Sequence, residues 1–149
     1  ESTGLHSVMT TPLIVGDYIY GIGSHGQVRG LLAETGERVW EAEGLTTRNR
    51  WGSAYFIQHE DRYFVYNENG DLIIAQFNPD GYVELDRTHL LNPTSRSGYG
   101  GARPGSRGRA THGQSDRLVV WSHPAFANRH LVLRNDEEII RVSMDQDDY

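Results

Sequence analysis

Hydrophobic and polar residues alternate in short runs along most of the chain, and turn residues separate the runs. The clearest alternation covers Asp17–Ile22, Arg62–Asn67 and His130–Arg134, and each run is followed by turn residues and a second apolar run. A period of two is typical of β-strands that bury one face. Asn69-Gly70 stands between two such runs and indicates a hairpin, because both residues tolerate positive φ. Amphipathic helical stretches are absent, so the pattern predicts an all-β chain.

The strand pattern is also repeated. Residues 10–41 align with residues 53–87 at an offset of 44, which places Asp17 on Asp61 and Gly26 on Gly70. A third copy, near 117–144, aligns with the first at an offset of 112. The longer interval comes from a Gly- and Arg-rich insertion at 92–116. A repeat of about 44 residues made of strand–turn–strand units is typical of a propeller blade.

We therefore expect residues 1–149 to form part of a β-propeller, with about three four-stranded antiparallel blades. Closed propellers contain about four to eight blades, so the predicted ring is incomplete. Two arrangements would complete it. In the first, which we favour, these residues are the C-terminal part of a longer propeller, and the remaining blades belong to the same parent chain. In the second, several copies of the chain close a ring as a homo-oligomer.

The stretch Leu31–Trp40, LLAETGERVW, resembles the repeat of pyrroloquinoline-quinone-type (PQQ-type) β-propellers. Thr35, Gly36 and Trp40 match that repeat, while Leu32 stands where the repeat prefers aspartate. Later stretches look like the closing blades of bacterial members of this family, which are similar to the outer-membrane protein assembly factor. The resemblance covers about four-fifths of the chain and fails in the insertion.

The resemblance implies structural roles for several residues of the repeat. In such repeats the Thr-Gly turn reverses the chain and the tryptophan packs between neighbouring blades, where burial of a large aromatic contributes about 2–3 kcal/mol. The residues assigned to the blade motif are Asp17, Thr35, Gly36, Trp40, Asn69, Gly70 and Trp121.

The resemblance also implies a function. We expect a non-catalytic interaction or scaffold module that binds a protein partner, with a periplasmic or exported location. The alternative is the C-terminal part of a PQQ-dependent dehydrogenase whose active site lies on other blades, with PQQ and calcium as cofactors. We assign no catalytic, cofactor-binding or metal-binding residue in this chain.

Composition narrows the enzymatic alternative. The chain has no cysteine, and all 14 of its basic residues are arginine. The absence of cysteine excludes thiolate metal sites and a cysteine nucleophile, and it argues against the dehydrogenases that carry a disulfide over the quinone. The absence of lysine excludes Schiff-base chemistry and the P-loop lysine. No apolar run approaches the ~18–20 residues of a membrane span.

The insertion differs from the rest of the chain in charge. Residues 92–115 contain four arginines and no acid, whereas the whole chain has a net charge of −6, so the remainder carries −10. Its candidate contacts with an anion or partner are Arg96, Arg103, Arg107 and Arg109. We favour a solvated loop between blades. The alternatives are an anionic partner, such as an acidic glycan, a phosphate or an acidic protein surface, and then nucleic acid, which we do not expect.

Other motifs have simpler interpretations. Gly21–Gly26 matches G-x-G-x-x-G, but a dinucleotide site needs a helix next and a second strand is predicted instead. The seven histidines lack the spacing of metal ligands, and we expect them in turns and on the surface. No G-x-S-x-G elbow occurs.

Overall fold

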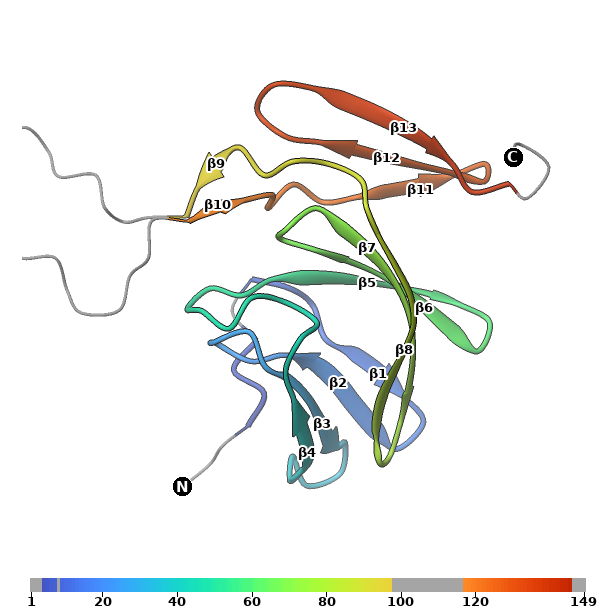
Figure 1. Cartoon of the computed structure of the whole chain (residues 1–149). Helices are drawn as coiled ribbons and strands as arrows, with labels where there is room; N and C mark the ends of the chain where they lie inside the picture. Colours follow the sequence, from blue (N-terminus) through green and yellow to red (C-terminus); the bar gives the residue numbers. More distant parts are fainter. Residues whose placement is uncertain (1–3, 8, 98–116, 146–149) are drawn as a thin grey trace, which may run out of the picture.

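The computed structural model describes residues 4–7, 9–97 and 117–145 of the chain. All regular secondary structure in this part of the chain is β, which confirms the predicted class. Three antiparallel sheets lie one after another, and a short hairpin extends from their side (Figure 1). The described residues contain no helix that is long and apolar enough to cross a membrane.

The first sheet contains β1 (Leu13–Val15), β2 (Tyr18–Ile22), β3 (Val28–Leu32) and β4 (Arg38–Ala42), paired in sequence order. Each strand is joined to the next by a short turn, as the alternating pattern predicts. Gly26, in the turn between β2 and β3, has φ +87°, a backbone conformation that residues with a Cβ rarely adopt.

The second sheet repeats this plan with longer strands. It contains β5 (Ala54–His59), β6 (Arg62–Asn67), β7 (Asp71–Asn78) and β8 (Gly81–His89), again in sequence order. The turn between β6 and β7 carries Gly70, 44 residues after Gly26, with a matching φ of +83°. The repeat therefore reproduces the backbone as well as the hydrophobic pattern.

The third sheet has three strands among the described residues, where four were expected. It contains β11 (Ala125–Ala127), β12 (His130–Arg134) and β13 (Ile139–Ser143). Its first two strands begin 112 residues after β1 and β2, at the predicted offset.

A separate two-stranded hairpin precedes the third sheet. β9 (Ser95–Arg96) pairs antiparallel with β10 (Leu118–Val119), and both lie outside the blade-like sheets. In Figure 1 this hairpin projects to the left of the stacked sheets. Residues 98–116, most of the predicted insertion, are not described by the structure.

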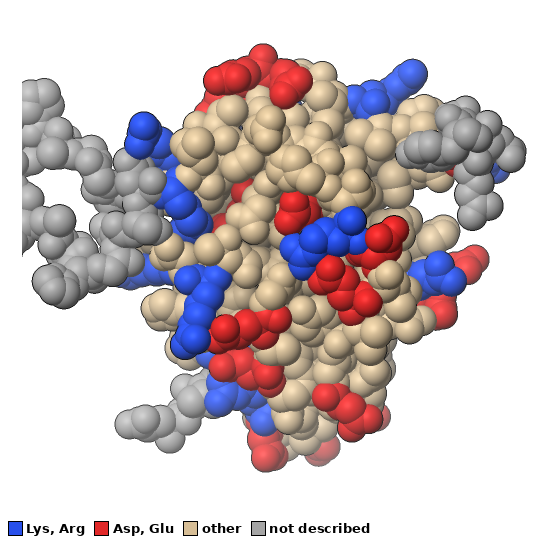
Figure 2. Space-filling model, in the orientation of Figure 1, with Lys and Arg blue, Asp and Glu red and all other residues tan. Residues whose placement is uncertain are grey.

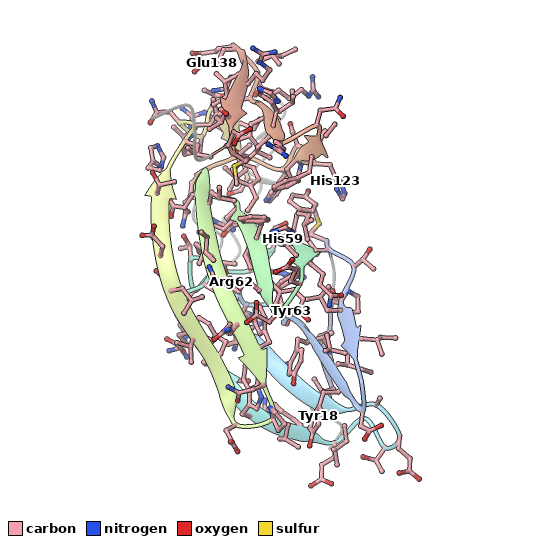
Figure 3. The ribbon with its side chains drawn as sticks, turned by 90° about the vertical axis from the view of Figure 1, so that its right-hand side faces the viewer. Tyr18, His59, Arg62, Tyr63, His123 and Glu138 are labelled. Atoms are coloured by element: carbon pink, nitrogen blue, oxygen red, sulfur yellow. The ribbon has the colours of Figure 1, made fainter. Side chains whose placement is uncertain are left out.

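The core lies between the sheets. Ile22 and Val28 of the first sheet pack with Tyr63, Val65 and Ile73 of the second. A second cluster joins the opposite face of the second sheet to the third and includes Tyr55, Tyr66, Leu72, Leu131 and Leu133. Figure 3 shows the same stacking, with Tyr18 at one end, Tyr63 and His59 in the middle and Glu138 at the other end.

Alternation within one strand explains this arrangement. On β6, Tyr63 and Val65 face the first sheet, while the residues between and after them, Phe64 and Tyr66, face the third. Successive side chains point to opposite faces of a strand, so a sheet that is apolar at consecutive positions needs a neighbour on both sides. The second sheet therefore holds the first and third sheets together.

Candidate functional site

One end of the sheets carries most of the polar contacts between distant parts of the chain. We call it the connector end, because it holds connections between strands. These are the turns 23–27, 67–71 and 135–138, the connection 43–53 and the described residues of the segment 90–124. Antiparallel strands bring these segments to the same end. The β9–β10 hairpin also leaves the sheets from this end.

Asparagines stabilise two of the three turns in the same way. Asn67 Oδ1 accepts hydrogen bonds from the backbone amides of Asn69 and Asp71, and Asn67 Nδ2 donates to the Leu45 carbonyl, each at 3.0 Å. Asn135 Oδ1 accepts from the amides of Glu137 and Glu138 at 2.8 Å. Its Nδ2 donates to the Asn92 carbonyl at 2.9 Å. Each asparagine thus closes a turn and fastens the preceding connection to it.

Glu68 lies beside Asn67 and is the central group of the connector end. Its side chain is fully buried, and its Oε2 accepts a 2.7 Å hydrogen bond from the guanidinium of Arg117, whose side chain is 14% exposed. Trp121 Nε1 lies 3.4 Å from the same oxygen. The Glu68 backbone accepts from the amide of Val120 and donates to the carbonyl of Ser53. One residue thereby connects three separate segments of the chain.

The protonation of Glu68 is governed by opposing effects. Burial raises the pKa of its carboxyl, and the charge and hydrogen bond of Arg117 act in the opposite direction without cancelling the rise. Glu68 Oε1 has no hydrogen-bond partner among the described residues, nor does Arg117 Nε. A buried carboxylate costs several kcal/mol unless a cation compensates it, so Arg117 is required wherever Glu68 is ionised.

Arg117 and the segment after it anchor the base of the β9–β10 hairpin. Arg117 also donates to the Arg50 carbonyl, at 3.1 Å, and its own carbonyl accepts from the amide of Ser97. Four residues further on, the Trp121 carbonyl accepts a 2.6 Å hydrogen bond from the Tyr55 hydroxyl. These contacts fix where the insertion leaves and rejoins the blades.

A second polar group holds the fourth strand of the second sheet. Asp71 on β7 accepts from Arg87 Nη1 at 3.1 Å and lies 2.9 Å from His89 Nδ1, both on β8. Burial acts to raise the pKa of Asp71, but hydrogen bonds with His89, Asn67 and Arg87 outweigh it, so the pKa is lowered. The hydrogen bond with Asp71, followed by that with Asn92, raises the pKa of His89.

The predicted anion contacts are only partly placed. Arg96 lies on β9, opposite Leu118 of β10. Arg103, Arg107 and Arg109 lie outside the described residues. Figure 2 shows arginine side chains along the left edge of the molecule, the side from which β9 and β10 project, with acidic side chains beside them. Of the four predicted contacts, Arg96 is the one that lies among the described residues.

The blade-motif residues of the first sheet lie mainly at its other end. Thr35 Oγ1 accepts from the amide of Glu37, and Gly36, with φ +71°, donates its amide hydrogen to the Leu32 carbonyl. The Asp17 carbonyl accepts from the amide of Ala33 in the adjoining turn. These residues close turns, and none contacts the Glu68 group.

Trp40, on β4, contacts both the first and the second sheet. Its indole lies over Gly30, where a Cβ would approach within 2.4 Å of the ring. Its Nε1 donates to the Asn78 carbonyl of β7 at 3.1 Å, and its ring centroid is 5.7 Å from that of Tyr20.

The remaining motif residues lie at the connector end. Asn69 Oδ1 accepts a 2.9 Å hydrogen bond from the Thr47 hydroxyl. A Cβ on Gly70 would lie 1.7 Å from the Leu91 carbonyl oxygen, and one on Gly26 would lie 2.2 Å from that of Thr47. Leu91 follows Thr47 by 44 residues, as Gly70 follows Gly26. The close contact between the turn glycine and a carbonyl oxygen is therefore repeated in the two sheets. Trp121 contacts Glu68, as described above.

A cleft of about 350 Å³ opens between the second and third sheets, at the end opposite the connectors. Phe64 and Phe126 stack at its base with ring centroids 5.7 Å apart, and His59 stacks on Phe64 at 5.6 Å. His130 and Met144 complete this part of the lining. Such a cleft can accept an apolar or aromatic group, but the described residues around it include no paired nucleophile and base.

Within the described ranges, no three His, Asp or Glu side chains lie together in a way that could hold a metal ion, and the sequence has no cysteine.

Comparison with known proteins gives structural likeness only. No family model matches the chain, and no curated protein matches it. Its structure is similar to that of BamB from Moraxella catarrhalis, with a TM-score of 0.48 and 14% identity over 89% of this chain and 29% of the other. It is also similar to quinohemoprotein alcohol dehydrogenase from Comamonas testosteroni, with a TM-score of 0.45 and 18% identity. That match covers 87% of this chain and 18% of the dehydrogenase. The chain spans less than a third of either protein.

Sequence reasoning missed the residues that organise the connector end. Glu68 and Arg117 were given no role of their own, because they are 49 residues apart in the chain. The repeat could have identified Asn67 and Asn135 as equivalent turn residues. They are separated by 68 residues, which is the difference between the two repeat offsets.

Proposed function

We propose that the chain is a non-catalytic interaction module of the propeller type, which binds an acidic protein partner at the connector end. The proposal follows the resemblance of the repeat to PQQ-type propellers. The Glu68–Arg117 pair is the observation that carries it. A fully buried carboxylate and its cation hold three segments together at the base of the hairpin that bears Arg96.

This use of Glu68 favours binding over catalysis. A general acid or base must reach the proton that it transfers, and a nucleophile must reach the reacting atom. Glu68 is fully buried and already hydrogen-bonded to Arg117, so it stabilises the arrangement of the connections. A preorganised surface loses less conformational entropy when a partner binds, which supports a scaffold role.

The test is binding of three defined polyanions to the full chain: poly-L-glutamate for an acidic protein surface, heparin for an acidic glycan, and a single-stranded RNA. We expect poly-L-glutamate to bind most tightly and to dissociate as salt rises, because exposed charges are screened beyond ~10 Å at 0.1 M salt. The variant with Arg103, Arg107 and Arg109 all changed to alanine should lose this binding.

A matched control removes the same charge elsewhere. Arg62, Arg129 and Arg141 are exposed and lie away from the connector end, with side-chain accessibilities of 58% for Arg62 and 76% for Arg129. Their combined change to alanine should leave poly-L-glutamate binding nearly unchanged. Equal loss in both variants would contradict a specific site and indicate a net-charge effect. Preference for heparin or RNA would contradict an acidic protein partner.

The same preparation tests the enzymatic alternative. The chain is mixed with PQQ and calcium and passed through a desalting column. If PQQ absorbance stays with the protein, the non-catalytic assignment is wrong. For location, we propose export to the periplasm, as the resemblance implies, and cell fractionation of the parent protein tests it.

A further inference from the structure

The cleft between the second and third sheets lies where the repeat loses its aromatic packing. In the first interface, between the first and second sheets, the Tyr20 ring is 2% exposed and two other rings stack on it. These are Trp40, with ring centroids 5.7 Å apart, and Phe77, at 5.4 Å. Phe64 stands 44 residues after Tyr20, but it is only half-buried and lines the cleft. Equivalent space is therefore filled in one interface and open in the next.

Two aromatic residues of the first interface are replaced by aspartates in the second. The strand register puts Asp86 at the position of Trp40 on the fourth strand. The residue 68 positions after Phe77 is Asp145. Neither aspartate supplies a ring to the second interface. Because both lie among the described residues, the cleft results from side chains that the structure places and does not depend on an unpaired strand.

The cleft has an apolar floor and room for an aromatic ring. Its volume of about 350 Å³ lies within the roughly 300–1,000 Å³ of small-molecule pockets. Phe64 and Phe126 form the floor, with their ring planes inclined by 21°. Met144 adds a thioether, whose sulfur makes favourable contacts with aromatic rings. The β5–β6 and β11–β12 turns on either side point to the right in Figure 1, away from the β9–β10 hairpin.

His130 gives the lining of the cleft a hydrogen-bond acceptor. Its Nδ1 lies 2.7 Å from the Asn128 carbonyl oxygen, which can only accept, so Nδ1 carries the hydrogen. In the neutral ring Nε2 is then an acceptor, and no described residue donates to it. A ligand with an N–H or O–H group can therefore bond to Nε2.

The charges beside the cleft compensate each other. Arg129 lines the cleft and pairs with Asp145 at 2.8 Å. The other residues of the lining carry neither a carboxylate nor a guanidinium. A charged ligand would bring its charge to the apolar floor without a partner there, which costs free energy. The lining therefore favours an uncharged ring.

Trp40 shows which contacts an aromatic donor makes between two sheets of this chain. Its ring stacks on Tyr20, and its Nε1 donates to the Asn78 carbonyl of the next sheet at 3.1 Å. A ring against Phe64 with a donor to His130 would repeat this combination of one stacking contact and one hydrogen bond.

We propose that the cleft binds a small, uncharged, planar aromatic compound that carries an N–H or O–H donor, of the indole or phenol class. The ring packs on Phe64 and Phe126, and its donor bonds to Nε2 of His130. The site lies at the end opposite the connectors, so it goes beyond the proposed function and does not rest on it.

The test follows the methyl signals of the two methionines in the full chain, labelled with ¹³C at the methyl carbon. Met144 lines the cleft and Met9 does not, so Met9 is an internal reference. The ligands are 3-methylindole and 1,3-dimethylindole, which lacks the N–H. We expect 3-methylindole to shift the Met144 signal saturably and to leave Met9 unchanged. It should bind about threefold to tenfold more tightly than 1,3-dimethylindole, the range expected for one net hydrogen bond.

Asp145→Phe restores the ring that Phe77 supplies in the second sheet, so it should fill the cleft and abolish the ligand-induced shift of Met144. Asp145→Asn is the matched control. Both variants remove the ion pair with Arg129, but only phenylalanine fills the space, and the asparagine variant should bind 3-methylindole as the parent chain does.

A third variant isolates the hydrogen bond. His130→Phe keeps a ring at this position and removes the acceptor, so the two indoles should bind it equally. Circular dichroism checks that all three variants fold.

Several results would overturn the proposal. These are no saturable shift of Met144, shifts of equal size at Met144 and Met9, equal binding of the two indoles by the parent chain, or unchanged binding by the Asp145→Phe variant. Tighter binding of acetyl-Gly-Gly-Trp-Gly-Gly-amide than of 3-methylindole would overturn the assignment to a small compound and indicate a tryptophan side chain of a partner protein. Poly-L-glutamate binding, which tests the connector end, is measured separately and does not affect this result.

Discussion

The second and third sheets share a backbone plan and differ in what covers them. The second sheet has a neighbour on each face and four strands, whereas the third is covered on one face and ends at β13. Val28, Leu72 and Ile139 pair with Ile22, Tyr66 and Arg134, three positions that the repeat offsets of 44 and 112 relate. They are 0%, 6% and 73% exposed. The same apolar position is therefore core in two sheets and surface in the third.

This difference shows that the repeat and the burial are separate properties. The repeat sets where strands and turns occur, because these depend on residues close together in sequence. Burial depends on whether another sheet lies alongside. Four predictions test the contrast, from the largest expected effect to the smallest.

The turn of the second sheet is the least tolerant position. Gly70→Ala places a Cβ 1.7 Å from the Leu91 carbonyl oxygen at a φ of +83°. Overpacking and positive φ together should lower the free energy of unfolding by about 4 kcal/mol, measured by urea denaturation. Gly36→Ala is the control, since φ is +71° but nothing lies within 4 Å, and it should cost about 1 kcal/mol. Equal effects would show that the close approach does not matter.

The buried pair at the connector end comes next. Arg117→Ala leaves the Glu68 carboxyl buried without its cation and should lower the free energy of unfolding by about 3 kcal/mol. Adding Glu68→Gln removes the uncompensated charge, so the double variant should recover about 1 kcal/mol or more. Urea denaturation of both variants at pH 7 measures this. A single variant within about 0.5 kcal/mol of the parent would contradict a structural role for the pair.

The equivalent apolar positions give the most direct comparison of the sheets. Val28→Ala, in the core between the first and second sheets, should cost about 2 kcal/mol. Ile139→Ala, at the matching position of the third sheet, should cost less than about 0.5 kcal/mol, although it removes more atoms. Thermal and urea unfolding of the isolated chain measure both. A large loss for Ile139→Ala would mean that this face is covered in solution.

The fourth strand of the second sheet should show a modest pH dependence. The hydrogen bond with Asp71 raises the pKa of His89, so the folded value lies above the unfolded value of about 6.5. The contact contributes its full stability below the unfolded value and loses it as pH rises through the folded value. Asp71 stays ionised over this range, because its own pKa is lowered.

His89→Gln should therefore differ most from the parent chain near pH 5.5 and least near pH 8.5, as measured by urea denaturation. Nuclear magnetic resonance titration of His89 gives a second measurement, in which Asp71→Asn should lower its pKa. A stability difference that grows with rising pH would have the wrong sign for this pair.

Residues near one another in sequence carried most of the fold prediction. Alternation over Asp17–Ile22 and Arg62–Asn67 indicated β2 and β6, and Asn69-Gly70 indicated the turn that follows β6. The offsets of 44 and 112 located the matching strands in the other sheets. The candidate site was predicted less well, because Arg103, Arg107 and Arg109 were chosen by composition and lie outside the described residues.

The sequence by itself determined that this protein consists of antiparallel strands in repeated units, because strand alternation and turn conformation are local properties. Only the tertiary structure decided that Glu68 meets Arg117 and that Tyr66 is buried. Those outcomes depend on which segments lie alongside one another. Burial and the compensation of charge are properties of the assembled sheets, and no single run of residues contains them.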